Sequence, residues 1–92
     1  MEIEFDPAKR VQTLDERGVD FRDAALVFAG LKVTFADDRF DYGEVRWITV
    51  GFLHGRMVIV VWTERAQRCR IISMRKANDK EQEVYLARMA GS

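Results

Sequence analysis

Cysteine, histidine and proline are almost missing from this sequence of 92 residues, which holds one of each. Because Cys69 is the sole cysteine, the chain forms no internal disulfide. Because His54 is the sole histidine, no cluster of residues has zinc-ligand spacing, and we expect neither a metal nor a cofactor. A charged fraction of 33% with only six glycines argues against disorder. The sequence therefore predicts one compact domain over residues 1–92.

Long apolar runs are also absent. The longest stretch, MVIVVW at residues 57–62, is far shorter than the roughly 20 residues that span a bilayer. The first ten residues lack the basic and then apolar pattern of a secretory leader. We therefore expect a cytoplasmic protein that does not bind membranes.

Charge is distributed unevenly, although the formal net charge is zero. Residues 1–44 contain eleven acidic and six basic side chains, whereas residues 45–77 contain one acidic and seven basic ones. A uniformly basic protein attracts nucleic acid nonspecifically, whereas one basic segment in a neutral chain indicates a local anion site. We call residues 45–77 the basic block; its densest part, 65–76, holds five cations and no acid.

Helix signals occupy the first third of the chain. Asp6 as N-cap, Pro7 at the first helical position and Gly18 just past the end predict one helix. Asp20 as cap and Gly30 as terminator bound a second helix, whose apolar residues share one face.

From residue 31 onward, the spacing of the apolar residues changes from the helical pattern to the pattern typical of strands. Four stretches rich in β-branched and aromatic residues predict a four-stranded antiparallel meander with a tight turn at His54 and Gly55; they cover residues 31–35, 45–53, 56–64 and 68–75. Asn78 followed three residues later by Glu81 resembles a capping box and predicts a C-terminal helix.

The expected fold class is therefore α+β, with a short N-terminal strand at residues 2–5, two helices, the four-stranded meander and a C-terminal helix. We expect the helices to pack on one face of the sheet. Strict alternation along residues 68–75 places Cys69, Ile71, Ser73 and Arg75 on one face and the intervening residues, Met74 included, on the other. Arginines of the basic block can then converge at one sheet edge, but the period does not determine which of them meet.

Several stretches, in order and at similar spacing, resemble the BrnT family of type II toxins from about residue 5 to residue 85. They are FDPAK at 5–9, RGVDFRDA at 17–24, YGEVRWITVG at 42–51, TER at 63–65 and, above all, RIISMRKANDKEQEVY at 70–85. The resemblance implies a RelE-like fold and ribonuclease toxicity. It also implies neutralisation in a hetero-oligomer with a BrnA-like ribbon-helix-helix antitoxin that binds promoter DNA.

The first predicted helix departs from that family. Thr13 stands where relatives often have Asn, and Glu16 and Arg17 stand where they often have Lys and His. The missing histidine removes a candidate acid or base. If that histidine only binds phosphate or antitoxin in relatives, Arg17 can take its place.

Ribonucleases of the implied fold are expected to act without metal, by attack of the substrate's own 2′-hydroxyl on the adjacent phosphate. This reaction needs a general base, a general acid and cations around the transition state. Because the planar arginine fork matches phosphate oxygens, Arg46, Arg65 and Arg75 are the cationic candidates. Glu44 and Glu64 are the candidate bases.

Four further residues are candidates for binding RNA: Lys9, Arg70, Lys76 and Tyr85. Each candidate also has a structural interpretation, because an arginine can pair with an acid from the first half of the chain and a helical tyrosine can lie in the core. The alternative function is a noncatalytic or degenerate toxin-like module that binds nucleic acid or antitoxin through the basic block.

Overall fold

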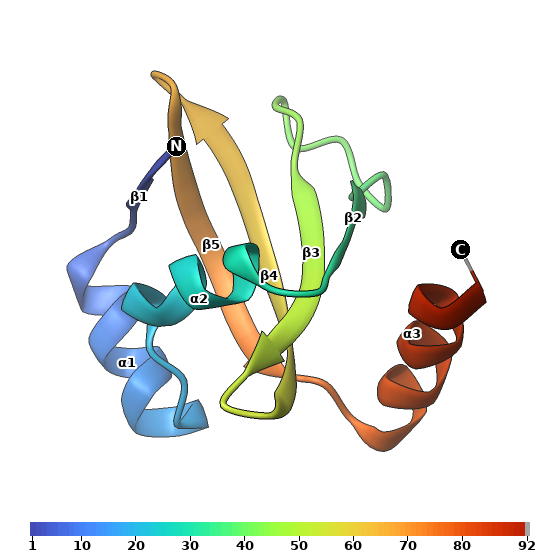
Figure 1. Ribbon diagram of the computed structural model, residues 1–92. Coiled ribbons are helices and arrows are strands. Elements are labelled where there is room, and N and C mark those ends of the chain that lie inside the picture. The colour runs from blue at the N-terminus through green and yellow to red at the C-terminus, as the bar shows by residue number, and fades with distance from the viewer. Residues whose placement is uncertain (92) are drawn as a thin grey trace.

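A computed structural model describes residues 1–91 and shows an α+β fold built on one five-stranded sheet, in the order β1-β5-β4-β3-β2 (Figure 1). The strands are β1 (Glu2–Glu4), β2 (Val33–Ala36), β3 (Trp47–Leu53), β4 (Arg56–Arg65) and β5 (Arg68–Lys76). The helices are α1 (Pro7–Arg17), α2 (Ala24–Ala29), α3 (Asp79–Gly91) and a 3-10 turn, η1 (Phe21–Asp23). No helix within residues 1–91 is long and apolar enough to cross a membrane.

The predicted antiparallel meander is confirmed, since β2, β3, β4 and β5 pair in succession. The short N-terminal strand adds a parallel element that the sequence did not place. It lies along β5, with Ile3 opposite Cys69, so the sheet is mixed. This pairing covers only the first three residues of β5, from Arg68 to Arg70.

The predicted caps of the first and last helices are confirmed, whereas Asp20 caps the 3-10 turn η1, and α2 begins after it without a side-chain cap bond. The Asp6 carboxylate accepts a hydrogen bond of 2.9 Å from the backbone N–H of Ala8, and Gly18 ends α1 in the left-handed conformation with φ 70°. At the other end of the chain, Asn78 and Glu81 form the reciprocal pair of a capping box, with distances of 2.8 and 3.0 Å. Both boundaries therefore follow from local chemistry.

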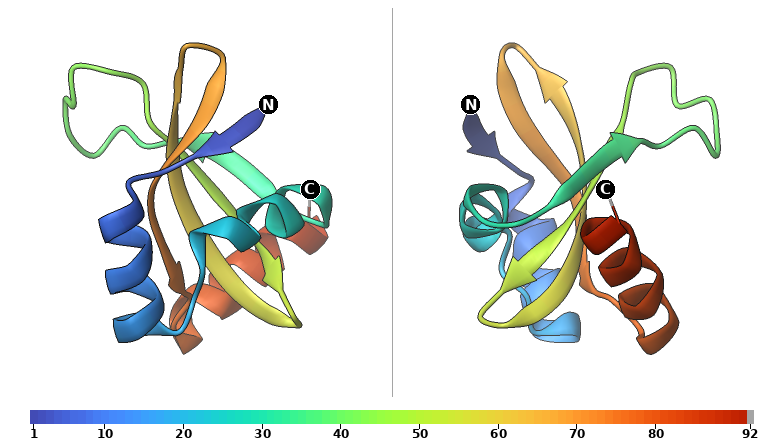
Figure 2. Two further views of the ribbon diagram at one scale, coloured as in Figure 1. Left: turned by 90° about the vertical axis from the view of Figure 1, so that its left-hand side faces the viewer. Right: turned by 45° about the vertical axis from the view of Figure 1, so that its right-hand side comes forward.

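The helices lie on both faces of the sheet, so the expectation that they share one face is wrong (Figures 1 and 2). Under α1, η1 and α2 lies a core built on Phe21, Val27 and Val60. On the opposite face, Tyr85 and Met89 of α3 pack on a second, smaller cluster made of Ile48, Val50, Met57, Ile59 and Ala77. Because each sheet face carries its own set of apolar residues, helices must shield both faces from water.

A register shift in β5 overturns the expected alternation. Val61 lies opposite Ser73 but Trp62 lies opposite Ile71, so Ile72 is an extra residue with no partner on β4. Cys69 and Ile71 consequently share the α1 and α2 face with Met74, which is fully buried in the same core. Arg70 and Arg75, five positions apart, share the α3 face because their partners, Thr63 and Ile59, do.

Gly51 of β3 permits the close approach of α2 to the sheet, and we expect Gly51→Ala to lower the free energy of unfolding by about 1–3 kcal/mol. A Cβ at this position would lie 2.8 Å from Cγ1 of Val27 and 3.3 Å from the carbonyl oxygen of Leu31. Urea denaturation measures the change. Gly91→Ala is the control, because nothing lies within 4 Å of its Cβ position. Equal stability of both variants would contradict the tight contact.

Candidate functional site

The cationic candidates do not converge at one place. Arg65 lies opposite Arg68 at the β4-β5 hairpin, whereas Arg75 lies opposite Ile59 near the other end of the sheet. The two positions are six residues apart along β4, which corresponds to about 20 Å. One scissile phosphate therefore cannot contact both arginines.

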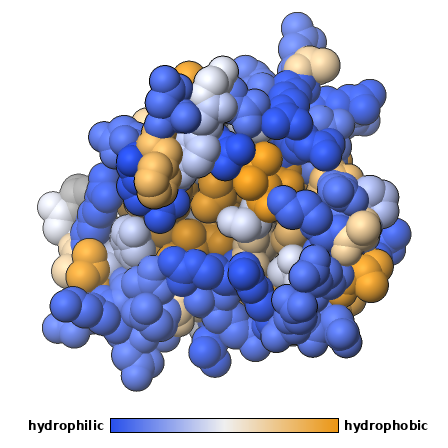
Figure 3. All heavy atoms as spheres, turned by 180° about the vertical axis from the view of Figure 1, so that it is seen from behind, coloured by the Kyte–Doolittle hydropathy of each residue, from blue (hydrophilic) through white to orange (hydrophobic). Residues whose placement is uncertain are grey.

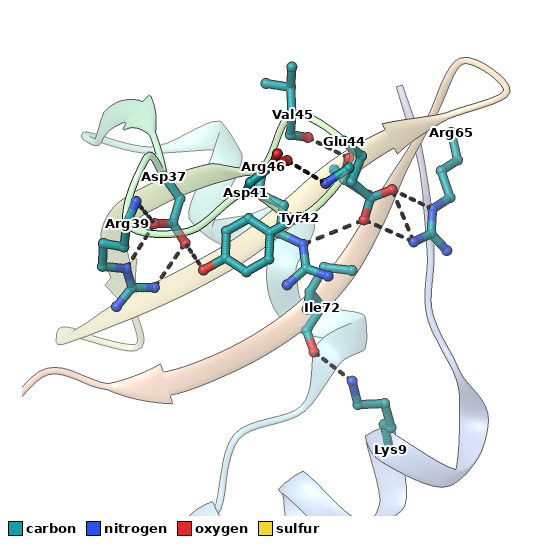
Figure 4. A network of polar contacts seen from close by, with 12 residues as sticks. Lys9, Asp37, Arg39, Asp41, Tyr42, Glu44, Val45, Arg46, Arg65 and Ile72 are labelled. Atoms are coloured by element: carbon teal, nitrogen blue, oxygen red, sulfur yellow. Dashed lines mark hydrogen bonds and ion pairs between the residues drawn. The ribbon is translucent and has the colours of Figure 1, made fainter.

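Near the hairpin, Glu44 holds two of the candidate arginines (Figure 4). Its carboxylate accepts hydrogen bonds of 3.0 to 3.2 Å from Arg65 and of 3.4 Å from Arg46. The Arg46 guanidinium also lies 4.0 Å from the centre of the Tyr42 ring. The hydrogen bonds from Arg65 are the main cause that lowers the pKa of Glu44, which makes this carboxylate a weaker base. We call Glu44, Arg46 and Arg65 the Glu44 cluster.

Glu64 does not belong to the Glu44 cluster. It is exposed and lies opposite Cys69, whose side chain is part of the core beneath α1 and α2. Cross-strand partners share a face, so the two candidate bases lie on opposite faces of the sheet.

The loop between β2 and β3 contains a second arginine–carboxylate pair, which the sequence did not indicate. Asp37 accepts two hydrogen bonds of 2.8 Å from the Arg39 guanidinium and one of 3.1 Å from the Tyr42 hydroxyl. The Asp37 side chain is only 1% exposed, and its hydrogen bonds from Arg39 hold its pKa well below the usual range. The only signal in the sequence is the density of acids around an arginine and a tyrosine in this loop.

A cavity of about 290 Å³ lies between the first half of α3, the β2-β3 loop and the sheet. Its polar lining includes Arg39, Arg75 and Glu81, and Tyr85 also faces it, whereas its apolar lining is Phe35, Ile48, Ile59 and Val61. Seen from behind, apolar side chains are visible at the centre of the surface among hydrophilic ones (Figure 3). We call this cavity the Arg75 pocket.

Arg75 is fixed at the wall of this pocket. Its two terminal nitrogens donate hydrogen bonds of 2.8 and 2.7 Å to the two carboxylate oxygens of Glu81. Glu81 also caps α3, so one carboxylate attaches the helix to the sheet and orients the arginine. The hydrogen bonds to Glu81 raise the pKa of Arg75, while burial and the charge of Arg39 act in the opposite direction. Tyr85 stacks on Phe35 with ring centres 6.0 Å apart.

The candidate RNA-binding residues are dispersed. Arg70 shares the face of Arg75 and lies 3.9 Å from Glu4. Lys76 points to the opposite face, where its Nζ lies 3.4 Å from the position that a Cβ on Gly18 would occupy. Lys9 reaches the edge of β5 from α1, and its Nζ donates a hydrogen bond of 3.2 Å to the carbonyl of Ile72 (Figure 4).

Lys9 lies in a groove of about 290 Å³ between α1 and β5. We call it the α1 groove. Thr13, Glu16 and Arg17, at which the sequence departs from its apparent relatives, also line this groove. So does Ser73, which lines the Arg75 pocket as well. The two depressions therefore meet at β5.

His54 lies in a tight turn, as predicted, and Cys69 is part of the core. His54 occupies the tight β3-β4 turn with φ 51°, followed by Gly55 with φ 79°. Cys69 is buried, and burial raises the pKa of its thiol to about 11, which disfavours the reactive thiolate. Within residues 1–91, no group of three or more His, Cys, Asp or Glu residues could hold a metal ion.

These features define a small α+β protein with a pocket on one sheet face, lined by two arginines, a tyrosine and the carboxylates that pair with those arginines. The family model of BrnT, the ribonuclease toxin of type II toxin–antitoxin systems, matches residues 5–81. The chain therefore belongs to the BrnT family, and an RNA target and an antitoxin partner follow from that membership. A search of curated proteins finds no match to the chain.

The Arg75–Glu81 pair makes stability depend on pH. Hydrogen bonds from Arg75 lower the pKa of Glu81 from 4.5 to about 2. Because the pKa is lowered in the folded state, ionised Glu81 stabilises the fold above about pH 4.5, and this contribution is lost as the pH falls through about 2. Glu81→Gln retains the capping box but should unfold at lower urea concentration than the wild type at pH 7, with the difference shrinking toward pH 2.

The control for this experiment is Glu83→Gln, an exposed carboxylate on the same helix. Its stability should follow that of the wild type over the whole pH range. A Glu81→Gln protein that is as stable as the wild type at pH 7 would show that the pair does not attach α3.

Proposed function

We propose that this protein is a metal-independent endoribonuclease that inhibits translation by cutting RNA at the Arg75 pocket, and that a BrnA-like ribbon-helix-helix antitoxin neutralises it. The observation that carries the proposal is Arg75 itself. It is a candidate cation that faces a cavity, it is held in one orientation by Glu81, and Tyr85 belongs to the same lining.

In this mechanism the 2′-oxygen of a ribose forms a bond to the adjacent phosphorus, and the bond from phosphorus to the 5′-oxygen of the next nucleotide breaks. The 2′-hydroxyl loses its proton to a base, and the departing 5′-oxygen gains one from an acid. The products are a 2′,3′-cyclic phosphate and a 5′-hydroxyl end. Negative charge on the phosphorane oxygens peaks in the transition state, where a preorganised arginine is most effective.

The geometry supports distinct roles for the candidates. Glu81 and the carbonyl of Lys76 accept three of the five N–H groups of Arg75, and the remaining two, on Nε and Nη2, are proposed to bind the phosphate. Tyr85 is proposed to donate a proton or to stack on a base, and the apolar floor suits the face of a nucleobase. Arg46, Arg65 and Glu44 lie toward the β4-β5 hairpin, with Arg65 about 20 Å from Arg75 along the sheet, and are proposed to contact another part of the RNA.

One observation favours the alternative of a module that binds but does not cut. Every arginine named as a candidate has a carboxylate within 4.0 Å: Glu44 for Arg46 and Arg65, Glu4 for Arg70, and Glu81 for Arg75. Partly neutralised arginines stabilise a transition state less than free ones. A cleavage assay therefore distinguishes the two functions.

We expect the purified protein to cleave RNA at an unchanged rate in excess EDTA and to leave 2′,3′-cyclic phosphate ends. Substituting deoxyribose at the cleaved position should abolish the reaction, because the attacking hydroxyl is then missing. End-group analysis of the fragments is the measurement. Binding of RNA without any cleavage would support the alternative, and a loss of activity in EDTA would contradict the mechanism.

Arg75→Ala should lower the cleavage rate by at least about tenfold, the loss expected from one transition-state contact. Arg75→Lys keeps a positive charge beside Glu81 but loses the planar fork, and so it should lose most of the activity while retaining more stability. Arg22→Ala removes an exposed arginine of η1 and is the control. If Arg75→Ala cleaves RNA as fast as Arg22→Ala does, the pocket is not the site of cleavage.

A further inference from the structure

The basic block is largely neutralised within the fold. Besides the pairs with Glu44 and Glu81, Arg68 lies 3.3 Å from Glu2 and Arg70 lies 3.9 Å from Glu4. Attraction of a polyanion depends on cations that exchange counterions for phosphates, and an arginine already bound to a carboxylate contributes less to that exchange. The strongest contribution must then come from cations that have no carboxylate partner.

Three such cations lie near one another, at one side of the molecule. They are Lys9, Arg17 and Lys76, and among the eight ion pairs within residues 1–91 none includes them. Lys9 and Arg17 line the α1 groove. Lys76 lies against Gly18, the residue that follows Arg17. The three charges therefore extend from the groove to the end of α1.

The open edge of β5 connects these cations with the Arg75 pocket. Because β1 pairs with β5 only as far as Arg70, no strand among residues 1–91 covers the edge beyond that residue. Lys9 binds the carbonyl of the extra residue Ile72, and the next residue, Ser73, lines both the α1 groove and the pocket. The two depressions therefore share a wall residue with a small side chain at the edge of the sheet.

We propose that Lys9, Arg17 and Lys76 form a phosphate-binding track for single-stranded RNA, which leaves the Arg75 pocket across the β5 edge at Ser73. The track rests on the proposed function, since it extends the substrate site of that reaction. It holds the RNA through its backbone and so does not depend on base sequence. In this proposal Lys76 binds an RNA phosphate although its side chain points away from the Arg75 pocket.

A purely structural role for the same cations makes different predictions. Arg17 lies in the last turn of α1 and Lys76 lies beside its end, where positive charge interacts favourably with the helix dipole. In that case, removing them lowers stability and leaves RNA affinity unchanged. Glu16 lines the same groove, and its negative charge would repel a phosphate there. Glu16→Gln should therefore strengthen RNA binding if phosphates lie in the groove.

The test uses a 2′-O-methyl oligoribonucleotide, which cannot be cleaved because it lacks the attacking hydroxyl. Fluorescence anisotropy gives its Kd at several salt concentrations. The triple variant Lys9→Ala, Arg17→Ala, Lys76→Ala should bind at least about tenfold more weakly at low salt, and the slope of log K against log salt should fall by about 2, or roughly 0.7 for each lost contact. Lys32→Ala, which removes an exposed lysine before β2 at the far edge of the sheet, should change neither quantity.

A folded triple variant with unchanged affinity and slope would overturn the track. So would a variant that loses only its complex with the antitoxin, since the surface would then belong to the partner protein. Arg75→Ala separates the two proposals. If Arg75→Ala still cleaves RNA while the triple variant fails to bind it, the proposed cleavage site is wrong and the phosphate-binding track is supported. If only Arg75→Ala is defective, the track is wrong and the cleavage site is supported.

Discussion

The extra residue at Ile72 determines which side chains of β5 share a face, and the arrangement of both candidate sites depends on it. Before the bulge, Cys69 and Ile71 face the core beneath α1 and α2; after it, Met74 does. Arg75 consequently faces α3. Without the added residue, the strict two-residue period would place Met74 on the α3 face and Arg75 in the apolar core. Burial of an unpaired guanidinium would cost far more than a bulge.

The bulge also determines which backbone group of β5 faces α1. The carbonyl of the extra residue is available to Lys9, so α1 is attached to β5 directly beside the boundary between the α1 groove and the Arg75 pocket. One irregularity thus supplies the orientation of Arg75, the contact of Lys9 and the half-buried position of Ser73 between the two depressions. In a regular strand, successive side chains alternate strictly between the two faces, so these three features would not occur together on neighbouring residues.

Electrostatic pairing gives the protein its second constraint. The acidic first part of the chain neutralises much of the basic block, through Glu2, Glu4 and Glu44, and α3 supplies Glu81 for Arg75. Such pairs orient the arginines more than they stabilise the fold, since partly exposed ion pairs contribute little. Preorganised donors are useful to a ribonuclease because charge develops on the phosphate only in the transition state.

Local sequence chemistry determined the elements of this protein. The N-cap Asp6, the left-handed Gly18, the capping box of Asn78 and Glu81 and the turn at His54 and Gly55 all involve neighbours within a few residues, and the structure contains each of them. The ordered motifs also sufficed to indicate the BrnT family. Such local rules do not determine which elements pack against one another. Tertiary structure alone decided that β1 joins β5, that α3 covers the second face, that a bulge interrupts the alternation and that acids distant in sequence neutralise the basic block. The physical reason is that burial and charge pairing are satisfied between residues remote in the chain, whereas periodicity and composition describe only neighbours.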